Sequence, residues 1–144
     1  MTAPAPQPNV TQAVPFFRVT SMEASLRFYL DGLGFTMKNK WTPDGHIRWC
    51  WLELGDAAIM LQEFHERHKP APGERVGLGV SIAFQCRDAI AIYHEAVARG
   101  IEAGRPFVGN GLWVTVMTDP DGYRLEFASP TDAPEESVYS DPAA

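Results

Sequence analysis

The pattern of apolar and polar residues predicts short strands interrupted by two helices. Apolar residues recur at helical spacing between Met22 and Leu33, and again between Ile90 and Val97. The apolar runs expected to be strands, each bounded by turn residues, are 14–19, 35–41, 47–54, 57–64, 80–86, 101–108, 112–118 and 123–127. Each predicted helix therefore follows the first strand of one half of the chain.

Capping residues mark the ends of both helices. Thr20, with Glu23 three residues later, has the sequence of a capping box, so the first helix is expected to begin there. Gly32 and Gly34 are expected to end it, because glycine accepts the positive φ of a helix C-terminus. Asp88 is expected to cap the second helix.

The second half of the chain repeats the first. A shift of about 67 residues lays Phe17 on Phe84, and the order strand-helix-strand-strand-strand then occurs twice. The predicted architecture is therefore α+β, with two tandem βαβββ modules at 13–64 and 79–128. Residues 65–78, which contain charged residues, Pro and Gly, are expected to link them.

Both ends are rich in Pro, Ala and small polar residues, so flexible tails are expected at 1–12 and 129–144. Because 129–144 holds four acidic and no basic residues, the body is nearly neutral although the net charge is −6. No basic patch suggests a nucleic-acid partner. No run reaches the ~20 apolar residues of a membrane span, and no leader sequence is evident, so a cytoplasmic protein is expected.

Cysteine and histidine residues do not form a recognisable site. Cys50 and Cys86 lie in apolar runs without metal-binding spacing and are expected to be buried free thiols. The four histidines are scattered and are expected to face water; they are His46, His65, His68 and His94.

A turn followed by a strand stands out near the end of the body. Asp119-Pro120-Asp121-Gly122-Tyr123 combines residues that favour turns for different physical reasons. In the strand that follows, Leu125 and Glu126 point to opposite faces. A shorter counterpart, Gly55-Asp56, leads to a strand in which Gln62 occupies the position of Glu126.

With Phe16-Phe17-Arg18-Val19 and Leu33-Gly34-Phe35, this turn resembles the vicinal oxygen chelate superfamily of glyoxalases, extradiol dioxygenases and bleomycin-resistance proteins. The resemblance implies that the strands curve into a cupped mixed sheet, with the helices on the outer face and the ligand inside. The character of the chain is closest to the metal-free bleomycin-resistance branch.

Enzymes of this superfamily hold a divalent metal at four places, which fall here on Val14, Gln62, Ser81 and Glu126. A catalytic metal needs about three good donors and an open position. Because Val14 has no donor and serine is a rare ligand, we expect neither metal nor cofactor. If a metal binds, Gln62 and Glu126 are expected to hold it.

Strand alternation extends the inner face from these positions to aromatic and polar neighbours. Trp49 and Trp51 share a face, so their indoles offer a broad surface to a planar ligand. Arg124 is expected to pair with Glu126. The predicted ligand-binding residues are Phe16, Arg18, Trp49, Trp51, Met60, Gln62, Phe64, Ser81, Trp113 and Glu126. No catalytic residue is identified.

Together with the missing donors and the many aromatic residues, the resemblance to the bleomycin-resistance branch implies a metal-independent homodimer that binds a small, planar or amphipathic molecule, such as an antibiotic. The alternative is a metal-dependent glyoxalase-like lyase or isomerase, or a dioxygenase, using Gln62 and Glu126. In a dry pocket Glu126 is also a candidate general base. A structural or regulatory dimer with an empty cup is the third hypothesis.

Overall fold

The computed structural model describes residues 5–142 and confirms two tandem βαβββ modules. The first module consists of β1 (Phe16–Val19), α1 (Met22–Leu26) with its π-helical continuation η1 (Arg27–Gly32), β2 (Thr36–Trp41), β3 (Trp49–Leu54) and β4 (Ala57–Glu63). A 3-10 turn, η2 (Glu66–His68), lies in the linker. The second module consists of β5 (Ser81–Gln85), α2 (Ala89–Ala98), β6 (Phe107–Gly109), β7 (Leu112–Thr118) and β8 (Arg124–Pro130).

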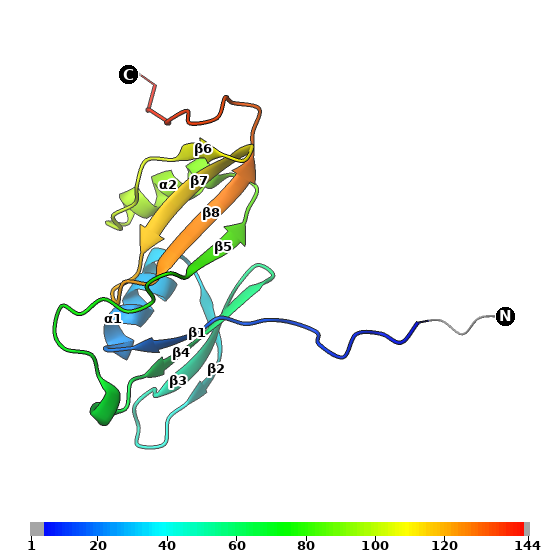
Figure 1. The fold of residues 1–144 in the computed structure, drawn as a ribbon. Coiled ribbons are helices and arrows are strands. Elements are labelled where there is room, and N and C mark those ends of the chain that lie inside the picture. The colour runs from blue at the N-terminus through cyan, green and yellow to red at the C-terminus, as the bar shows by residue number, and fades with distance from the viewer. Residues whose placement is uncertain (1–4, 143–144) are drawn as a thin grey trace.

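Each module has its own four-stranded mixed sheet. The strand orders are β1-β4-β3-β2 and β5-β8-β7-β6, and the first strand of each module runs parallel to the last. The remaining neighbours are antiparallel. Figure 1 shows the modules lying end to end, with α1 close to the junction between them. The identical order in both sheets confirms the repeat predicted from the sequence.

Two predicted helix details differ in the structure. The N-cap of α1 is Ser21, whose hydroxyl accepts a hydrogen bond from the Ala24 N–H, and not Thr20. Thr20 precedes the cap by one residue, and its hydroxyl instead donates a hydrogen bond to Asp121 in the other module. On α2 the predicted cap at Asp88 is confirmed, whereas Val97, expected on the apolar face, is half exposed.

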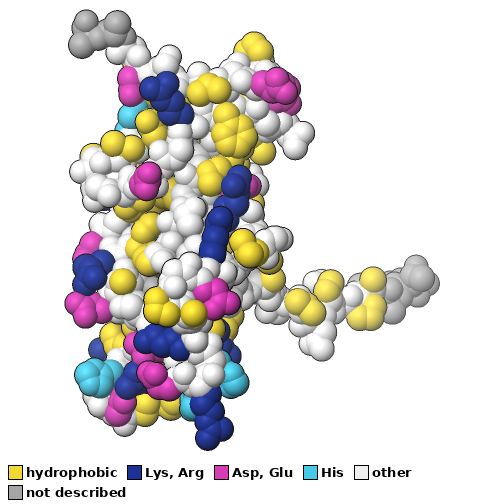
Figure 2. All heavy atoms as spheres, turned by 60° about the vertical axis from the view of Figure 1, so that its left-hand side comes forward, with side chains coloured by type: hydrophobic (Ala, Val, Ile, Leu, Met, Phe, Trp, Pro, Cys, Tyr) yellow, Lys and Arg dark blue, Asp and Glu magenta, His cyan; other side chains and the backbone are white. Residues whose placement is uncertain are grey.

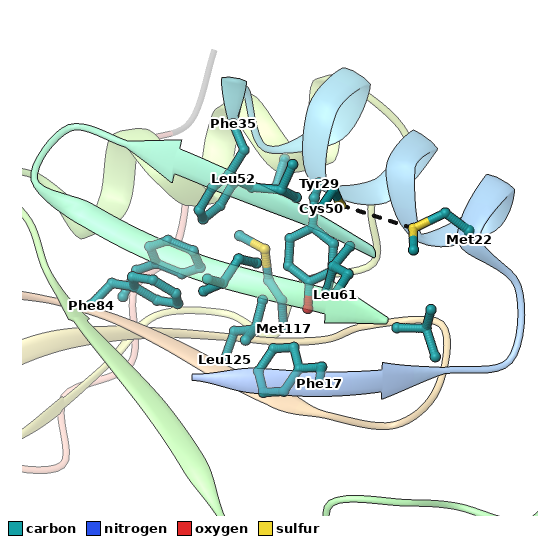
Figure 3. Close-up of a cluster of buried hydrophobic side chains, with 14 residues drawn as sticks. Phe17, Met22, Tyr29, Phe35, Cys50, Leu52, Leu61, Phe84, Met117 and Leu125 are labelled. Carbon is teal, nitrogen blue, oxygen red and sulfur yellow. Dashed lines mark hydrogen bonds between the residues drawn. The ribbon is translucent and has the colours of Figure 1, made fainter. Parts of the chain in front are cut away.

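Alternate strand residues of both modules enter one shared core. Leu61 and Leu125, which occupy equivalent places in β4 and β8, are fully buried, as the predicted division of faces requires. Figure 3 shows side chains from the two modules interleaved in a single apolar cluster. The cluster includes Phe17, Tyr29, Phe35, Cys50, Leu52, Leu61, Phe84, Met117, Leu125 and Phe127. The modules therefore do not have separate cores.

The turn at 119–123, singled out in the sequence, joins the second module to the first. Asp119 is buried, and its carboxylate accepts a hydrogen bond of 2.9 Å from the Tyr29 hydroxyl. The other oxygen of Asp119 accepts from the N–H groups of Asp121 and Tyr123, both at 2.9 Å. Burial raises the pKa of Asp119, and burial together with the Asp119 charge raises that of Tyr29. One carboxylate thus shapes the turn and binds the opposite module.

Two further contacts strengthen the same joint. Asp121 accepts hydrogen bonds from both the N–H and the hydroxyl of Thr20, the latter at 2.6 Å. Tyr123 donates its hydroxyl to the Arg18 carbonyl at 2.8 Å and stacks on the Phe17 ring at a centroid distance of 4.2 Å. The turn therefore fixes β1 as well as η1.

The two ends of the described chain behave differently. Residues 5–13 are exposed and leave the body as an extended arm in both Figure 1 and Figure 2. At the other end β8 continues to Pro130, two residues past residue 128, where the second module was predicted to end. The following segment hydrogen-bonds to the second module, for example from the Tyr139 N–H to the Pro106 carbonyl at 2.8 Å. Flexibility of this segment in solution stays a prediction.

No helix within residues 5–142 is both long and apolar enough to cross a membrane. On the face drawn in Figure 2, lysine and arginine side chains are scattered among acidic and apolar ones.

Candidate functional site

The inner face of the first sheet carries three tryptophans. Strand register places Trp41 opposite Trp49 and Trp49 opposite Gln62, and in the next row Trp51 lies opposite Met60. Parallel pairing extends the two rows into β1, where Arg18 lies opposite Gln62 and Phe16 opposite Met60. Partners in register point to the same side of a sheet. The first sheet therefore presents two adjacent rows rich in aromatic side chains, Trp41-Trp49-Gln62-Arg18 and Trp51-Met60-Phe16.

This aromatic face is accessible in the single chain. Trp41 is 55% exposed and Phe16 40%, and the other members of both rows except exposed Arg18 are partly buried. Buried Cys50 and Leu52 alternate with Trp49 and Trp51 along β3, so the indoles are not needed to fill the core. Such an exposed aromatic surface is typical of an interaction site.

The inner face of the second sheet carries smaller side chains than that of the first, together with one ion pair. Glu126 lies opposite Ala83 on one side and Val116 on the other, and Arg124 lies opposite Ser81. As predicted, Arg124 pairs with Glu126, at 2.9 Å. Small side chains surround the half-buried carboxylate of Glu126, whereas the corresponding places of the first sheet carry aromatic rings. The two modules thus share a fold but offer different surfaces.

Trp113 does not belong to this surface. Its register partners are Val108 and Ser129, which are buried on the helix side of the second sheet. Its ring lies edge-on to Tyr139 with centroids 6.1 Å apart. Trp113 therefore lies on the helix side of the second sheet, whereas Glu126 lies on its inner face and the predicted tryptophans Trp49 and Trp51 lie on the first sheet. Phe64, just after β4, is half buried, and Ser81 is exposed at the start of β5.

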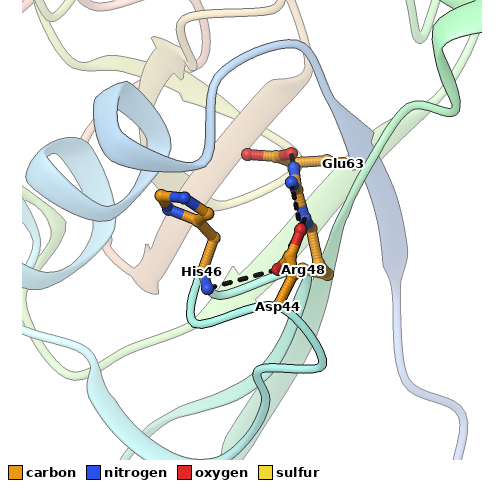
Figure 4. A network of polar contacts seen from close by, with 4 residues as sticks. All are labelled: Asp44, His46, Arg48 and Glu63. Carbon is orange, nitrogen blue, oxygen red and sulfur yellow. Dashed lines mark hydrogen bonds and ion pairs between the residues drawn. The ribbon is translucent and has the colours of Figure 1, made fainter.

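Polar contacts stabilise the β2–β3 hairpin, which carries Trp41, Trp49 and Trp51. Arg48 pairs with both Asp44 and Glu63, and it thereby ties the tip of the β2–β3 hairpin to the end of β4 (Figure 4). The Arg48 hydrogen bond lowers the pKa of Asp44. Within β3 the Trp51 indole N–H donates to Glu53 at 2.8 Å, which restricts the ring. This network was not predicted from the sequence, although Asp44 and Arg48, four residues apart at a hairpin tip, could have indicated it.

The positions expected for a metal are not assembled in the chain. Gln62 and Glu126 lie on different sheets and share no hydrogen bond. Val14 precedes β1 and brings no donor atom. Within residues 5–142, no three His, Cys, Asp or Glu side chains are grouped so that they could hold a metal ion. His46, His65, His68 and His94 are all exposed, as predicted.

The two arginines of the inner faces are engaged within the chain. The Arg18 guanidinium lies 4.4 Å above the Phe16 ring, a cation–π contact, and Arg124 is paired with Glu126. Of the two thiols, Cys50 is buried as predicted whereas Cys86 is half buried; burial raises the pKa of both, that of Cys50 to about 11.

The inner faces are open surfaces and not closed cavities. Larger hollows lie elsewhere, one of about 890 Å³ along β5 and the start of α2 and one of about 690 Å³ between the linker and the 119–123 turn. Neither is lined by a tryptophan, by Gln62 or by Glu126. A ligand bound to the aromatic rows would be covered on one side only.

Residues 10–127 match the model of the Glyoxalase/Bleomycin resistance protein/Dioxygenase superfamily, and the chain belongs to this family. No curated protein matches it in sequence. Solved structures with the same fold include the antibiotic binding protein TnmS3 from Streptomyces sp. CB03234, which is 20% identical with a TM-score of 0.66 over 87% of this chain and 100% of that one.

Two further structures show the same likeness. A bleomycin-binding protein, solved in complex with bleomycin, is 21% identical with a TM-score of 0.64, covering 83% of this chain and 98% of its own. TioX from Micromonospora sp. ML1 is 15% identical with a TM-score of 0.62, covering 83% and 99%. At these identities the likeness establishes the fold.

Proposed function

We propose that the protein binds a planar or amphipathic small molecule, of the kind represented by antibiotics, without a metal ion. The observation that carries the proposal is the exposed pair of aromatic rows on the first sheet. Trp49 and Trp51 lie on the same face of β3, and Met60 lies next to Trp51 on β4, which separates β3 from β1. Neither indole ring belongs to the buried core. Flat rings stack on such a surface with little loss of side-chain entropy. The proposal includes no catalytic step.

A second copy of the chain is expected to complete the site. Ligand sites commonly bury 70–90% of a small molecule, which an open sheet face does not provide. The first sheet of one chain, facing the second sheet of its partner, would place aromatic rings on one side of the ligand and the Arg124–Glu126 pair on the other. We therefore propose a homodimer with two such sites and, as the sequence suggests, a cytoplasmic location.

Binding can be tested by titrating a panel of planar compounds, bleomycin included, against intrinsic tryptophan fluorescence. The Trp51→Ala variant is expected to weaken binding about tenfold, because loss of one stacked ring removes about 1.4 kcal/mol. Trp113→Phe is the matched control, since Trp113 faces α2 and should leave affinity unchanged. Equal weakening by both substitutions, or no quenching by any compound, would contradict the proposal.

The metal-dependent alternative is separated from it by metal analysis. Purification without tags or chelators, followed by elemental analysis, is expected to find no stoichiometric Ni, Zn, Mn or Fe. About one tightly held metal per chain, lost in a Glu126→Gln variant, would instead favour a lyase or dioxygenase that uses Gln62 and Glu126. Light scattering of the purified chain tests the dimer separately.

A further inference from the structure

The C-terminal segment 136–141 lies beside β6 in the manner of an additional strand (Figure 1). Val138 forms an antiparallel bridge with Phe107. The flanking hydrogen bonds run from the Val108 N–H to the Ser137 carbonyl at 2.9 Å and from the Tyr139 N–H to the Pro106 carbonyl at 2.8 Å. This pattern is that of a closely spaced, non-hydrogen-bonded pair in an antiparallel ladder. The segment therefore covers the outer edge of the second sheet.

Side chains of the segment alternate between the two faces of that sheet. Val138 lies on the side of Phe107, where both are exposed, at 61% and 37%. Tyr139 points to the helix side, where its ring contacts those of Tyr93 and Trp113 at centroid distances of 6.3 and 6.1 Å. The ring contacts of Tyr139 anchor the segment, and its backbone hydrogen bonds to β6 set its register.

An ion pair closes the far end of the segment on α2. His94 Nε2 lies 2.6 Å from a carboxylate oxygen of Asp141 and 3.4 Å from the Tyr139 hydroxyl. The hydrogen bond from His94 lowers the pKa of Asp141, with a smaller effect from Arg105. The titratable and charged groups near this contact are Asp88, Tyr93 and His94 from α2, Arg105 from the loop before β6, and Tyr139 and Asp141 from the segment.

We propose that residues 136–141 are a detachable edge strand, and that the contact between His94 and Asp141 determines how tightly it is attached. Detachment leaves the β6 edge without a partner and uncovers the ring of Trp113. An open strand edge next to an aromatic ring is suited to pairing with another extended segment. The proposal does not depend on ligand binding.

Amide hydrogen exchange of the full chain, followed residue by residue by NMR, tests the proposal. The N–H groups of Val108 and Tyr139 are expected to be protected at pH 6, and protection is expected to fall about two- to fivefold in Asp141→Asn, the range for an exposed ion pair. His94→Ala should lower protection by a similar factor in the wild type and have no further effect in Asp141→Asn. Tyr139→Ala should abolish protection at both amides.

Matched controls distinguish this mechanism from general loosening. Asp132→Asn removes the same charge from the stretch between β8 and the segment 136–141, away from His94, and should leave protection unchanged. Core amides of Leu61 and Leu125 report whether the fold is intact in each variant. The proposal is overturned if the two edge amides exchange as fast as those of residues 5–13, or if Asp132→Asn and Asp141→Asn have equal effects.

Discussion

Replacing Asp119 by alanine is expected to loosen the joint between the modules. The buried carboxylate accepts three hydrogen bonds, two from backbone N–H groups of its own turn and one from the Tyr29 hydroxyl. Each turn bond contributes about 1 kcal/mol, and a buried tyrosine hydroxyl without a partner costs about 1–3 kcal/mol. The burial that raises the pKa of Asp119 makes its charge costly, which offsets part of the loss. The net expectation is about 3 kcal/mol.

A double-mutant cycle with Tyr29→Phe isolates the contact between the modules. Tyr29→Phe alone is expected to cost about 1.5–3 kcal/mol, because it removes a hydrogen bond to a charged group. The double variant should cost about 1–2 kcal/mol less than the sum of the single variants. Free energies of unfolding come from urea titrations followed by circular dichroism and tryptophan fluorescence.

Asp56→Ala is the internal control for this cycle. Asp56 occupies the corresponding turn of the first module and is exposed, so its replacement should cost less than about 0.5 kcal/mol. Strict additivity of the Asp119 and Tyr29 substitutions would refute the reasoning, because it would mean that the hydrogen bond between the modules contributes nothing. Equal costs for Asp119→Ala and Asp56→Ala would refute it as well.

Three other outcomes are expected from the geometry. Because the folded pKa of Asp119 is raised above its ordinary value of 3.8, its contribution to stability is full below about pH 3.8 and declines as pH rises through the folded pKa. The free energy of unfolding of the wild type minus that of Asp119→Asn, measured with urea between pH 3.5 and 7, should therefore fall as pH rises. A rise would contradict the assignment. Gly122→Ala should destabilise the protein by about 1–2 kcal/mol more than Gly45→Ala in thermal unfolding. Both glycines have positive φ, 100° and 85°, so the backbone strain is similar. Of the two, only Gly122 places a new Cβ against other atoms, at 2.5 Å from Arg75 Cγ and 3.3 Å from the Val76 carbonyl oxygen. At pH 7.5 a thiol reagent should label Cys86 before Cys50, whose pKa is about 11, and mass spectrometry after partial labelling would detect the reverse order.

The repeat and the division of strand faces could be predicted from the sequence because they depend on local patterns. Leu61 and Leu125 alternate with Gln62 and Glu126, and this alternation alone determines which side enters the core. The cap of α1 could not be predicted in the same way. Thr20 and Ser21 are both good caps, and what decides between them is a hydrogen bond from Thr20 to Asp121, 101 residues away.

Two other features could not be predicted from the sequence for a similar reason. Trp113 has the residue type of a ligand contact, yet its face is fixed by its pairing with Ser129 on the helix side. The segment after β8 has the composition of a flexible tail, but composition averages over residues. Two specific side chains, Tyr139 and Asp141, bring it onto α2.

The 119–123 turn has a consequence for how this molecule can change. Its hydrogen bonds lie at the junction of the modules, whereas Trp49 and Trp51 lie on the open face of the first sheet and contribute little to that junction. Substitutions on this open face, where we propose that a ligand binds, should therefore have little effect on the free energy of unfolding, which is small in a protein of this size. One turn thus holds the two modules together, and the aromatic rows of the first sheet can change without weakening that junction.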